Sequence, residues 1–105
     1  MRAMKRTLSA SLLVLALSCA WAQTNVDFTR TEDVIYGRKF GTALTLDVLQ
    51  PLPANGAAVI AIISGGWFSS HDNINPDRFR PLLNRGYTVF PVVHGSQPKF
   101  VVTEI

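Results

Sequence analysis

The alternation of apolar and polar residues predicts a strand hairpin in the first half of the chain. In residues 42–51, TALTLDVLQP, the side chains repeat with the period of two that is typical of a half-buried strand. The expected inner face consists of Leu44, Leu46 and Val48, and the expected outer face of Thr45 and Asp47. Residues 33–41 predict the antiparallel partner strand, which ends in a turn at Gly41. The two prolines and the Asn-Gly pair of PLPANG then predict a loop.

A different pattern follows, in which residues 57–63, AAVIAII, are apolar on both faces and rich in β-branched side chains. This pattern is typical of a parallel strand that helices cover on each side. The short length and the flanking glycines argue against a buried helix. Residues 87–93, YTVFPVV, predict the neighbouring strand, so the second half of the chain reads as a right-handed βαβ unit.

The segment between these two strands predicts a short helix. Asn75 is suited to cap it and Pro76 to its first position. Because Pro81 lacks an amide proton and fits only a first turn, we expect the helix to begin near Arg78 and to end at Gly86. Its expected buried face consists of Phe79, Leu82 and Leu83. The fold class predicted is therefore α/β.

Residues 1–22 have the layout of a secretory signal peptide. Basic residues in MRAMKR precede the apolar run SLLVLAL, and Ala20 and Ala22 stand before Gln23 as an A-x-A cleavage signal. The apolar run is shorter than the roughly 20 residues of a stable membrane span. An uncleaved anchor and a lipoprotein acylated at Cys19 are the alternatives. We expect the mature chain to be secreted or periplasmic, without a stable membrane span.

Removal of this leader changes the charge balance. The formal net charge of the whole chain is +3, but three of its ten basic residues lie in the leader, so seven remain against seven acidic residues. This balance, without a basic cluster, argues against a nucleic-acid partner. Cys19 is the single cysteine, so the mature chain would have no disulfide and no Cys-ligated metal. We expect neither a metal nor a cofactor.

The stretch ISGGWFSSH leaves the apolar strand 57–63 through two glycines. Open α/β sheets bind ligands at the carboxyl ends of parallel strands, and glycine lets backbone amides face a ligand without a Cβ in the way. Paired amides of this kind form an oxyanion hole. We expect the amides of Gly65, Gly66 and Trp67 to serve this role. Trp67 is expected to line the substrate pocket, and His94, which ends the neighbouring strand, to contact the substrate.

This loop and its surroundings resemble the α/β-hydrolases of the carboxylesterase and feruloyl/acetyl-xylan-esterase-like group, whose corresponding loop reads H-G-G-G-W or close to it. In this chain, Ile63 replaces the histidine and Ser64 the first glycine. The resemblance extends over roughly residues 31–105 and includes LDVLQP, LLNRGYTV and VVHGSQP. It implies hydrolysis of a small-molecule or carbohydrate-linked carboxylic ester by a serine nucleophile. A serine-peptidase-like α/β-hydrolase is the alternative within the same fold.

The chain departs from that group at the nucleophile. The group places its serine in a G-x-S-x-G elbow, followed by an acid and a histidine. In this sequence the glycine pair with that spacing is Gly37 and Gly41, and Lys39 stands at its centre. We therefore expect an N-terminal fragment, residues 23–105, of a longer hydrolase, inactive by itself. In the group's usual strand order, strand 57–63 would then have an unpaired apolar edge that favours aggregation.

The remaining candidates carry weaker signals. Ser64 is better explained as a loop serine that bonds to backbone than as a nucleophile, because the sequence places no base beside it. His71 and His94 have the chemistry of a base or metal pair, but no carboxylate stands at ligand spacing from them. The competing functional class is a small, non-catalytic exported binding protein.

Overall fold

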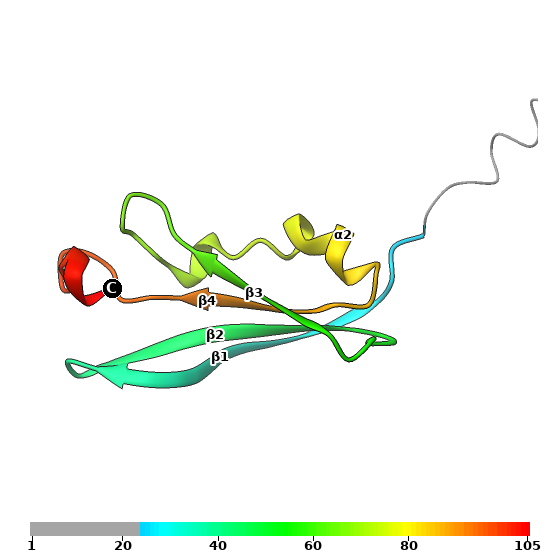
Figure 1. Ribbon diagram of the computed structural model, residues 1–105, viewed down its shortest axis with the longest axis horizontal. Helices are drawn as coiled ribbons and strands as arrows, with labels where there is room; N and C mark the ends of the chain where they lie inside the picture. Colours follow the sequence, from blue (N-terminus) through cyan, green and yellow to red (C-terminus); the bar gives the residue numbers. More distant parts are fainter. Residues whose placement is uncertain (1–23) are drawn as a thin grey trace, which may run out of the picture.

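The computed structural model describes residues 24–105, which form one four-stranded mixed sheet of order β1-β2-β4-β3 (Figure 1). The strands are β1 (Phe28–Lys39), β2 (Thr42–Pro51), β3 (Ala58–Ile63) and β4 (Thr88–Val93). The expected signal peptide and Cys19 lie outside the described residues, so the leader and its alternatives stay predictions. None of the helices in residues 24–105 has both the length and the apolar character that crossing a membrane requires.

The strand pairing confirms the predicted hairpin and βαβ unit. β1 and β2 pair antiparallel across a two-residue turn at Phe40 and Gly41, both of which have positive φ. β3 and β4 pair in parallel, from Ala58 opposite Thr88 to Ile63 opposite Val93. β2 joins the two units because it pairs antiparallel with β4. The carboxyl ends of β3 and β4 therefore meet at the same edge of the sheet.

The predicted single helix is divided into short pieces. They are η2 (Pro76–Phe79) and α2 (Arg80–Leu83), and two further turns, η1 (His71–Asn73) and η3 (Val102–Glu104), lie outside the predicted helix. Asn75 caps η2 as expected, since its Oδ1 accepts the Asp77 N–H at 3.1 Å. Pro81 lies in the first turn of α2 and has no N–H to donate to the carbonyl four residues earlier, which explains why a continuous α-helix does not begin before it. Gly86 ends the segment at φ +87°.

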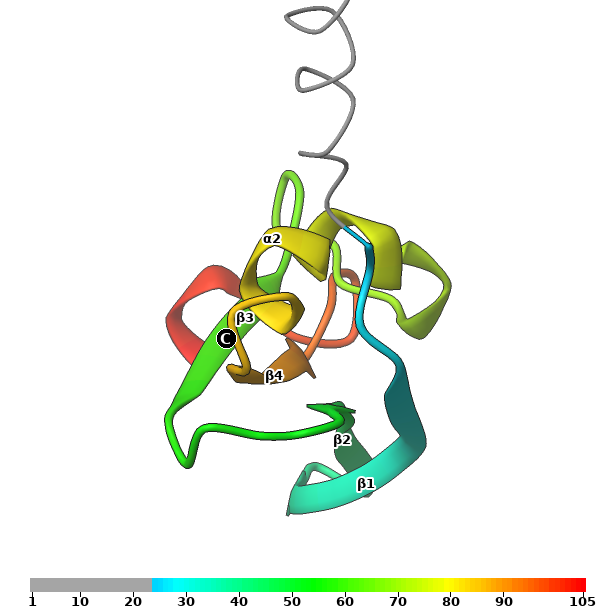
Figure 2. The same cartoon turned by 90° about the vertical axis from the view of Figure 1, so that its right-hand side faces the viewer.

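A small core forms between α2 and one face of the sheet. Leu49 of β2, Leu83 of α2 and Val89 of β4 are fully buried in mutual contact, and Phe79 and Leu82 pack against them. Figure 2 shows α2 lying over β4 on this side of the sheet. The side chains expected to face inward from the helical segment therefore do so.

The prediction for the faces of β2 is wrong. The expected inner residues Leu44, Leu46 and Val48 are half-buried, whereas Asp47, Leu49 and Pro51 on the opposite face are fully buried. Asp47 tolerates burial because Arg30 of β1 lies beside it, with Nη2 2.7 Å from Oδ2. The alternation correctly identified the two faces of β2. The charge of Asp47 led to the wrong prediction of which face is exposed to solvent.

β3 lies at the edge of the sheet, with β4 as its neighbour, so the predicted edge position is confirmed. The prediction that helices cover both of its faces is wrong for residues 24–105. Ile60 and Ile62 are 70% and 71% exposed, while Ala61 faces the core beneath α2. Although β3 is apolar on both faces, only the face of Ala61 is covered within residues 24–105.

Candidate active site

The loop that leaves β3 makes a tight turn from Gly65 to Phe68. The Gly65 N–H donates to the Phe68 carbonyl at 2.9 Å, and the Phe68 N–H donates to the Gly65 carbonyl at 3.0 Å. The two central residues, Gly66 and Trp67, have φ of +58° and +66°. Positive φ at both central positions is the signature of a type I′ turn, which glycine adopts readily and tryptophan does not.

The turn uses one of the three amides that the sequence predicts as oxyanion donors. The Gly65 N–H is bonded to Phe68, whereas the N–H groups of Gly66 and Trp67 have no acceptor among residues 24–105. A Cβ added at Gly65 or Gly66 would meet no atom within 4 Å, so the space beside both residues is open. Two of the three predicted donors are therefore available to a ligand.

Ser64, directly before the turn, contacts His94 at the end of β4. The His94 Nε2 lies 2.8 Å from the Ser64 Oγ, and the His94 Nδ1 lies 2.6 Å from the Gly95 carbonyl oxygen. A carbonyl oxygen can only accept, so Nδ1 donates to it, and in the neutral ring Nε2 accepts from the Ser64 hydroxyl. No local pattern in the sequence predicts this pair, whose members are 30 residues apart. The available hint was that both residues follow neighbouring parallel strands.

Further hydrogen bonds join the loops after β3 and β4. The hydroxyl of the buried Ser69 donates to the carbonyl of Ile63 at the end of β3 and accepts the His94 N–H at 3.1 Å. The Ser69 N–H donates to the Ser96 Oγ at 3.1 Å, and the Gln97 N–H donates to the Trp67 carbonyl at 3.3 Å. The two loops therefore form one hydrogen-bonded unit at the carboxyl edge of the parallel strands.

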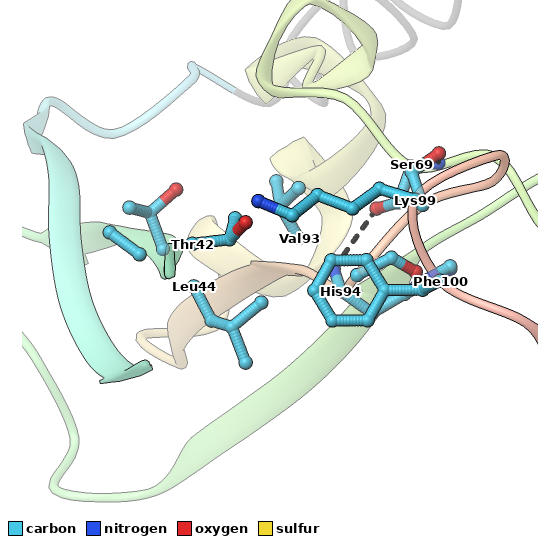
Figure 3. A pocket seen from close by; sticks show the side chains of 11 residues that line it. Thr42, Leu44, Ser69, Val93, His94, Lys99 and Phe100 are labelled. Carbon is cyan, nitrogen blue, oxygen red and sulfur yellow. Dashed lines mark hydrogen bonds between the residues drawn. The ribbon is translucent and has the colours of Figure 1, made fainter. Parts of the chain in front are cut away.

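Two cavities adjoin this unit. One of about 290 Å³ is lined by Ile62, Ile63, Ser64, Gly65, Asn73 and Arg78. The other, of about 240 Å³, is lined by His94, and Figure 3 shows the Lys99 side chain reaching across it beside Ser69, His94 and Phe100. His94 lines this cavity, and its expected contact with a substrate stays a prediction. Trp67, which is 51% exposed, lines neither of these two cavities.

His71 belongs to a different cluster. Its Nε2 lies 3.2 Å from Asp47 Oδ1 and 3.8 Å from Glu32 Oε1, so the structure gives His71 and His94 different partners. The ligand atoms of Glu32, Asp47 and His71 lie within 4.8 Å of one another. The guanidinium of Arg30 already pairs with Asp47 and also lies 3.2 Å from Glu32, which opposes a cation at this place. The cluster is therefore best explained as an ion-pair network of Arg30 with Asp47 and Glu32, beside which the His71 ring of η1 lies, with Nε2 3.2 Å from Asp47 Oδ1.

The solved structures that this chain resembles are esterases. No protein-family model and no curated protein sequence matches the chain. The structure of a C6-C4 SN3 inhibited esterase B from Lactobacillus rhamnosis superposes with a TM-score of 0.59 and 24% identity over 90% of this chain. The structure described simply as esterase B from the same organism gives a TM-score of 0.53 and 26% identity over 86% of this chain. The structure of the same esterase inhibited by a C4-C4 SN3 tributyrin phosphonate gives a TM-score of 0.54 and 22% identity over 90% of this chain.

The match covers a limited part of these enzymes. The chain spans about a third of their length, namely 31% to 33%. The predicted fold class is confirmed: residues 24–105 have the α/β fold of part of an α/β-hydrolase sheet, with a strand hairpin followed by one βαβ unit.

Proposed function

We propose that this chain is the N-terminal part of an exported serine hydrolase of carboxylic esters, and that the turn after β3 supplies its oxyanion hole. The observation that carries the proposal is the pair of N–H groups of Gly66 and Trp67, which have no acceptor among residues 24–105 and stand at the carboxyl edge of the parallel strands. Such donors stabilise the negative charge that develops on an ester carbonyl oxygen. The proposal omits Gly65, because its N–H is bonded within the turn.

The conformation of Trp67 supports a functional turn. A non-glycine residue in the left-handed region costs roughly 1–2 kcal/mol. Trp67 has φ +66° and is 51% exposed, so burial of its side chain offsets little of that cost. Backbone strain of this kind is concentrated at sites where a ligand or reacting group requires a particular geometry. We propose that the strained turn directs the two amides toward the substrate, with the Trp67 ring beside it.

The substrate class follows by analogy. The structural neighbours are named as esterases, and one was solved with a tributyrin phosphonate. We propose short-chain carboxylic esters as substrates, with the cavity beside His94 receiving one arm of the ester. Carbohydrate-linked esters, as in the feruloyl/acetyl-xylan-esterase-like group, are the finer alternative. The leader in residues 1–22 supports secretion or a periplasmic location.

The first experiment reads the gene beyond the codon for Ile105. A G-x-S-x-G elbow, in frame or after a frameshift, is the expected result, because the proposed enzyme uses an elbow serine and residues 24–105 contain no such elbow. If nothing resembling a hydrolase follows, the proposal fails and the non-catalytic exported binding protein becomes the better explanation.

The second experiment compares two glycine variants of the longer protein. Gly66 and Gly56 both have positive φ, +58° and +83°, and an added Cβ meets no atom within 4 Å at either. Both alanine variants therefore carry a similar backbone penalty, but Gly66 lies in the turn and Gly56 in the loop before β3. Loss of one oxyanion donor typically lowers kcat about 10²–10³-fold. Alanine keeps the N–H of residue 66 but disfavours the positive φ that orients it, so we expect a loss of up to that size on tributyrin for Gly66→Ala and little change for Gly56→Ala. Equal kcat values in the two variants would count against the proposal.

A further inference from the structure

We propose that Ser64 is itself an acylatable serine, with His94 as its base, which takes activated carboxylic esters and organophosphonates. This reactivity goes beyond the proposed function, in which the nucleophile lies outside the described residues. Sequence reasoning set Ser64 aside because it found no base beside it. The structure supplies that base, since the His94 Nε2 lies 2.8 Å from the Ser64 Oγ.

The three groups have the arrangement of an activated nucleophile. A serine reacts when a histidine nitrogen accepts its proton and a third group holds the ring in the correct tautomer. Here the Gly95 carbonyl oxygen, 2.6 Å from the His94 Nδ1, fixes the proton on Nδ1. The Nε2 lone pair is thereby directed at the Ser64 hydroxyl.

The backbone at His94 and at the next residue, Gly95, is restrained by two contacts. The His94 N–H donates to the hydroxyl of Ser69, which is 8% exposed. The next residue, Gly95, packs so closely on Phe100 that an added Cβ would lie 2.6 Å from the ring. Phe100 is itself 3% exposed, so its buried ring limits movement of the backbone at Gly95. A base whose position is fixed in advance loses less entropy in the reaction.

The serine is open to a substrate. Ser64 is exposed and lines the cavity of about 290 Å³ with Gly65, Asn73 and Arg78. The Arg78 side chain has no ion pair among residues 24–105, and a guanidinium suits the oxygens of a phosphonate or carboxylate. The donor amides of Gly66 and Trp67 follow Ser64 by two and three residues. Nucleophile, base and oxyanion donors therefore share one edge of the sheet.

The reaction balances with an ester and water. The Ser64 Oγ attacks the carbonyl carbon while its proton moves to the His94 Nε2. The bond from that carbon to the leaving oxygen then breaks, and the leaving oxygen takes the proton, which gives an alcohol and acyl-Ser64. Water attacks the acyl group with His94 again accepting the proton, and the acid and free Ser64 result. A carbonyl behind the histidine orients the ring but adds no negative charge, so we expect reaction with activated esters and slow turnover.

The test is covalent labelling of the full 105-residue chain with diisopropyl fluorophosphate, read by mass spectrometry. In this reaction the P–F bond breaks, an Oγ–P bond forms, fluoride leaves and the serine proton passes through His94 to solvent. We expect one adduct, on Ser64, that is absent from Ser64→Ala and forms at least about tenfold more slowly in His94→Gln, because general-base help contributes roughly 10²–10⁴-fold. Ser70→Ala is the matched control. Ser70 lies in the same loop, and its hydroxyl accepts the Asp72 N–H and has no hydrogen bond to a histidine among residues 24–105.

The outcomes separate this proposal from the proposed function. No adduct on the wild-type chain, an adduct that persists in Ser64→Ala, or unchanged labelling of His94→Gln would each overturn it. A serine with a merely structural hydrogen bond to His94 predicts the first of these results. The labelling requires no residue beyond Ile105, whereas the proposed function is tested by the gene sequence and kinetics of a longer protein. A negative labelling result therefore does not refute the proposed function, and a negative gene sequence does not refute the reactivity of Ser64.

Discussion

Replacement of Asp47 by alanine is expected to remove a large share of the folding free energy. The Asp47 side chain is fully buried, and its Oδ2 lies 2.7 Å from Arg30 Nη2 and 2.8 Å from Arg30 Nε. Its Oδ1 accepts the Asp33 N–H at 3.1 Å and lies 3.2 Å from His71 Nε2. The carboxylate thus connects β1, β2 and η1, and no nearby carboxylate is similarly buried among the described residues.

The size of the effect follows from these contacts. Breaking a buried ion pair from one side typically costs about 3–5 kcal/mol. The Arg30 side chain is 27% exposed and lies 3.2 Å from Glu32, so part of its charge stays compensated after the substitution. We therefore expect about 3 kcal/mol, at the lower end of that range. A domain of about 80 residues has a total stability of roughly 4–12 kcal/mol, so the variant loses between a quarter and three quarters of it.

The assay is urea unfolding followed by circular dichroism, with two further variants. Asp47→Asn keeps an oxygen for the Asp33 N–H but loses the charge, so we expect a smaller loss of about 2 kcal/mol. In a double-mutant cycle with Arg30→Met, the loss from Asp47→Ala should shrink by 1 kcal/mol or more, on the order of couplings between contacting residues. A loss below about 1 kcal/mol for Asp47→Ala, or additive single effects, would refute the claim that the Arg30 pair permits burial of this carboxylate.

Three further predictions concern other parts of the sheet. Gly95→Ala places a Cβ 2.6 Å from the buried ring of Phe100, so urea unfolding should show a loss of about 1–3 kcal/mol, and an unchanged midpoint would mean that the ring moves aside freely. Burial raises the pKa of Tyr36 above its usual 10.0, so its contribution to stability is present below that pH and lost as the pH rises through the folded-state pKa. Tyr36→Phe should therefore flatten the alkaline decline of stability, measured by unfolding at increasing pH, and an identical slope would contradict this. Ile60→Thr combined with Ile62→Thr, at side chains 70% and 71% exposed, should reduce light scattering while changing stability by less than about 0.5 kcal/mol, and undiminished scattering would place the aggregation surface elsewhere.

The strands could be predicted from the sequence because their signals are local. The period of two in residues 42–51 and the apolar run in 57–63 each depend on neighbours within a few positions. The buried face of β2 could not be predicted in the same way. Its burial of Asp47 depends on Arg30, which lies 17 residues away and approaches through the β1–β2 register. Periodicity shows that a strand has two distinct faces. Which face is buried depends here on a long-range ion pair that no local pattern reveals.

In the candidate site, too, local features could be predicted from the sequence and long-range contacts could not. The Gly-Gly-Trp turn was predictable because glycines at the end of a parallel strand have few other uses. The bond from the Gly65 N–H to Phe68 was not, because it depends on the φ values that Gly66 and Trp67 adopt. The contact between Ser64 and His94 joins residues 30 positions apart and exists only because β3 and β4 are parallel neighbours. Local patterns predicted the loop that forms the candidate site, and tertiary pairing decides which of its groups meet.

The shared turn also allows the two proposed reactions to be told apart. Both use the amides of Gly66 and Trp67, so Gly66→Ala should slow ester hydrolysis by a longer protein and labelling of Ser64 alike. Ser64→Ala removes only the label on Ser64 and leaves an elbow nucleophile intact, although the turn loses its hydrogen bond to His94. If Ser64→Ala instead slowed tributyrin hydrolysis as severely as Gly66→Ala, that hydrogen bond would be positioning the oxyanion donors. Labelling of the short chain would then be the measurement that separates a reactive Ser64 from a positioning one.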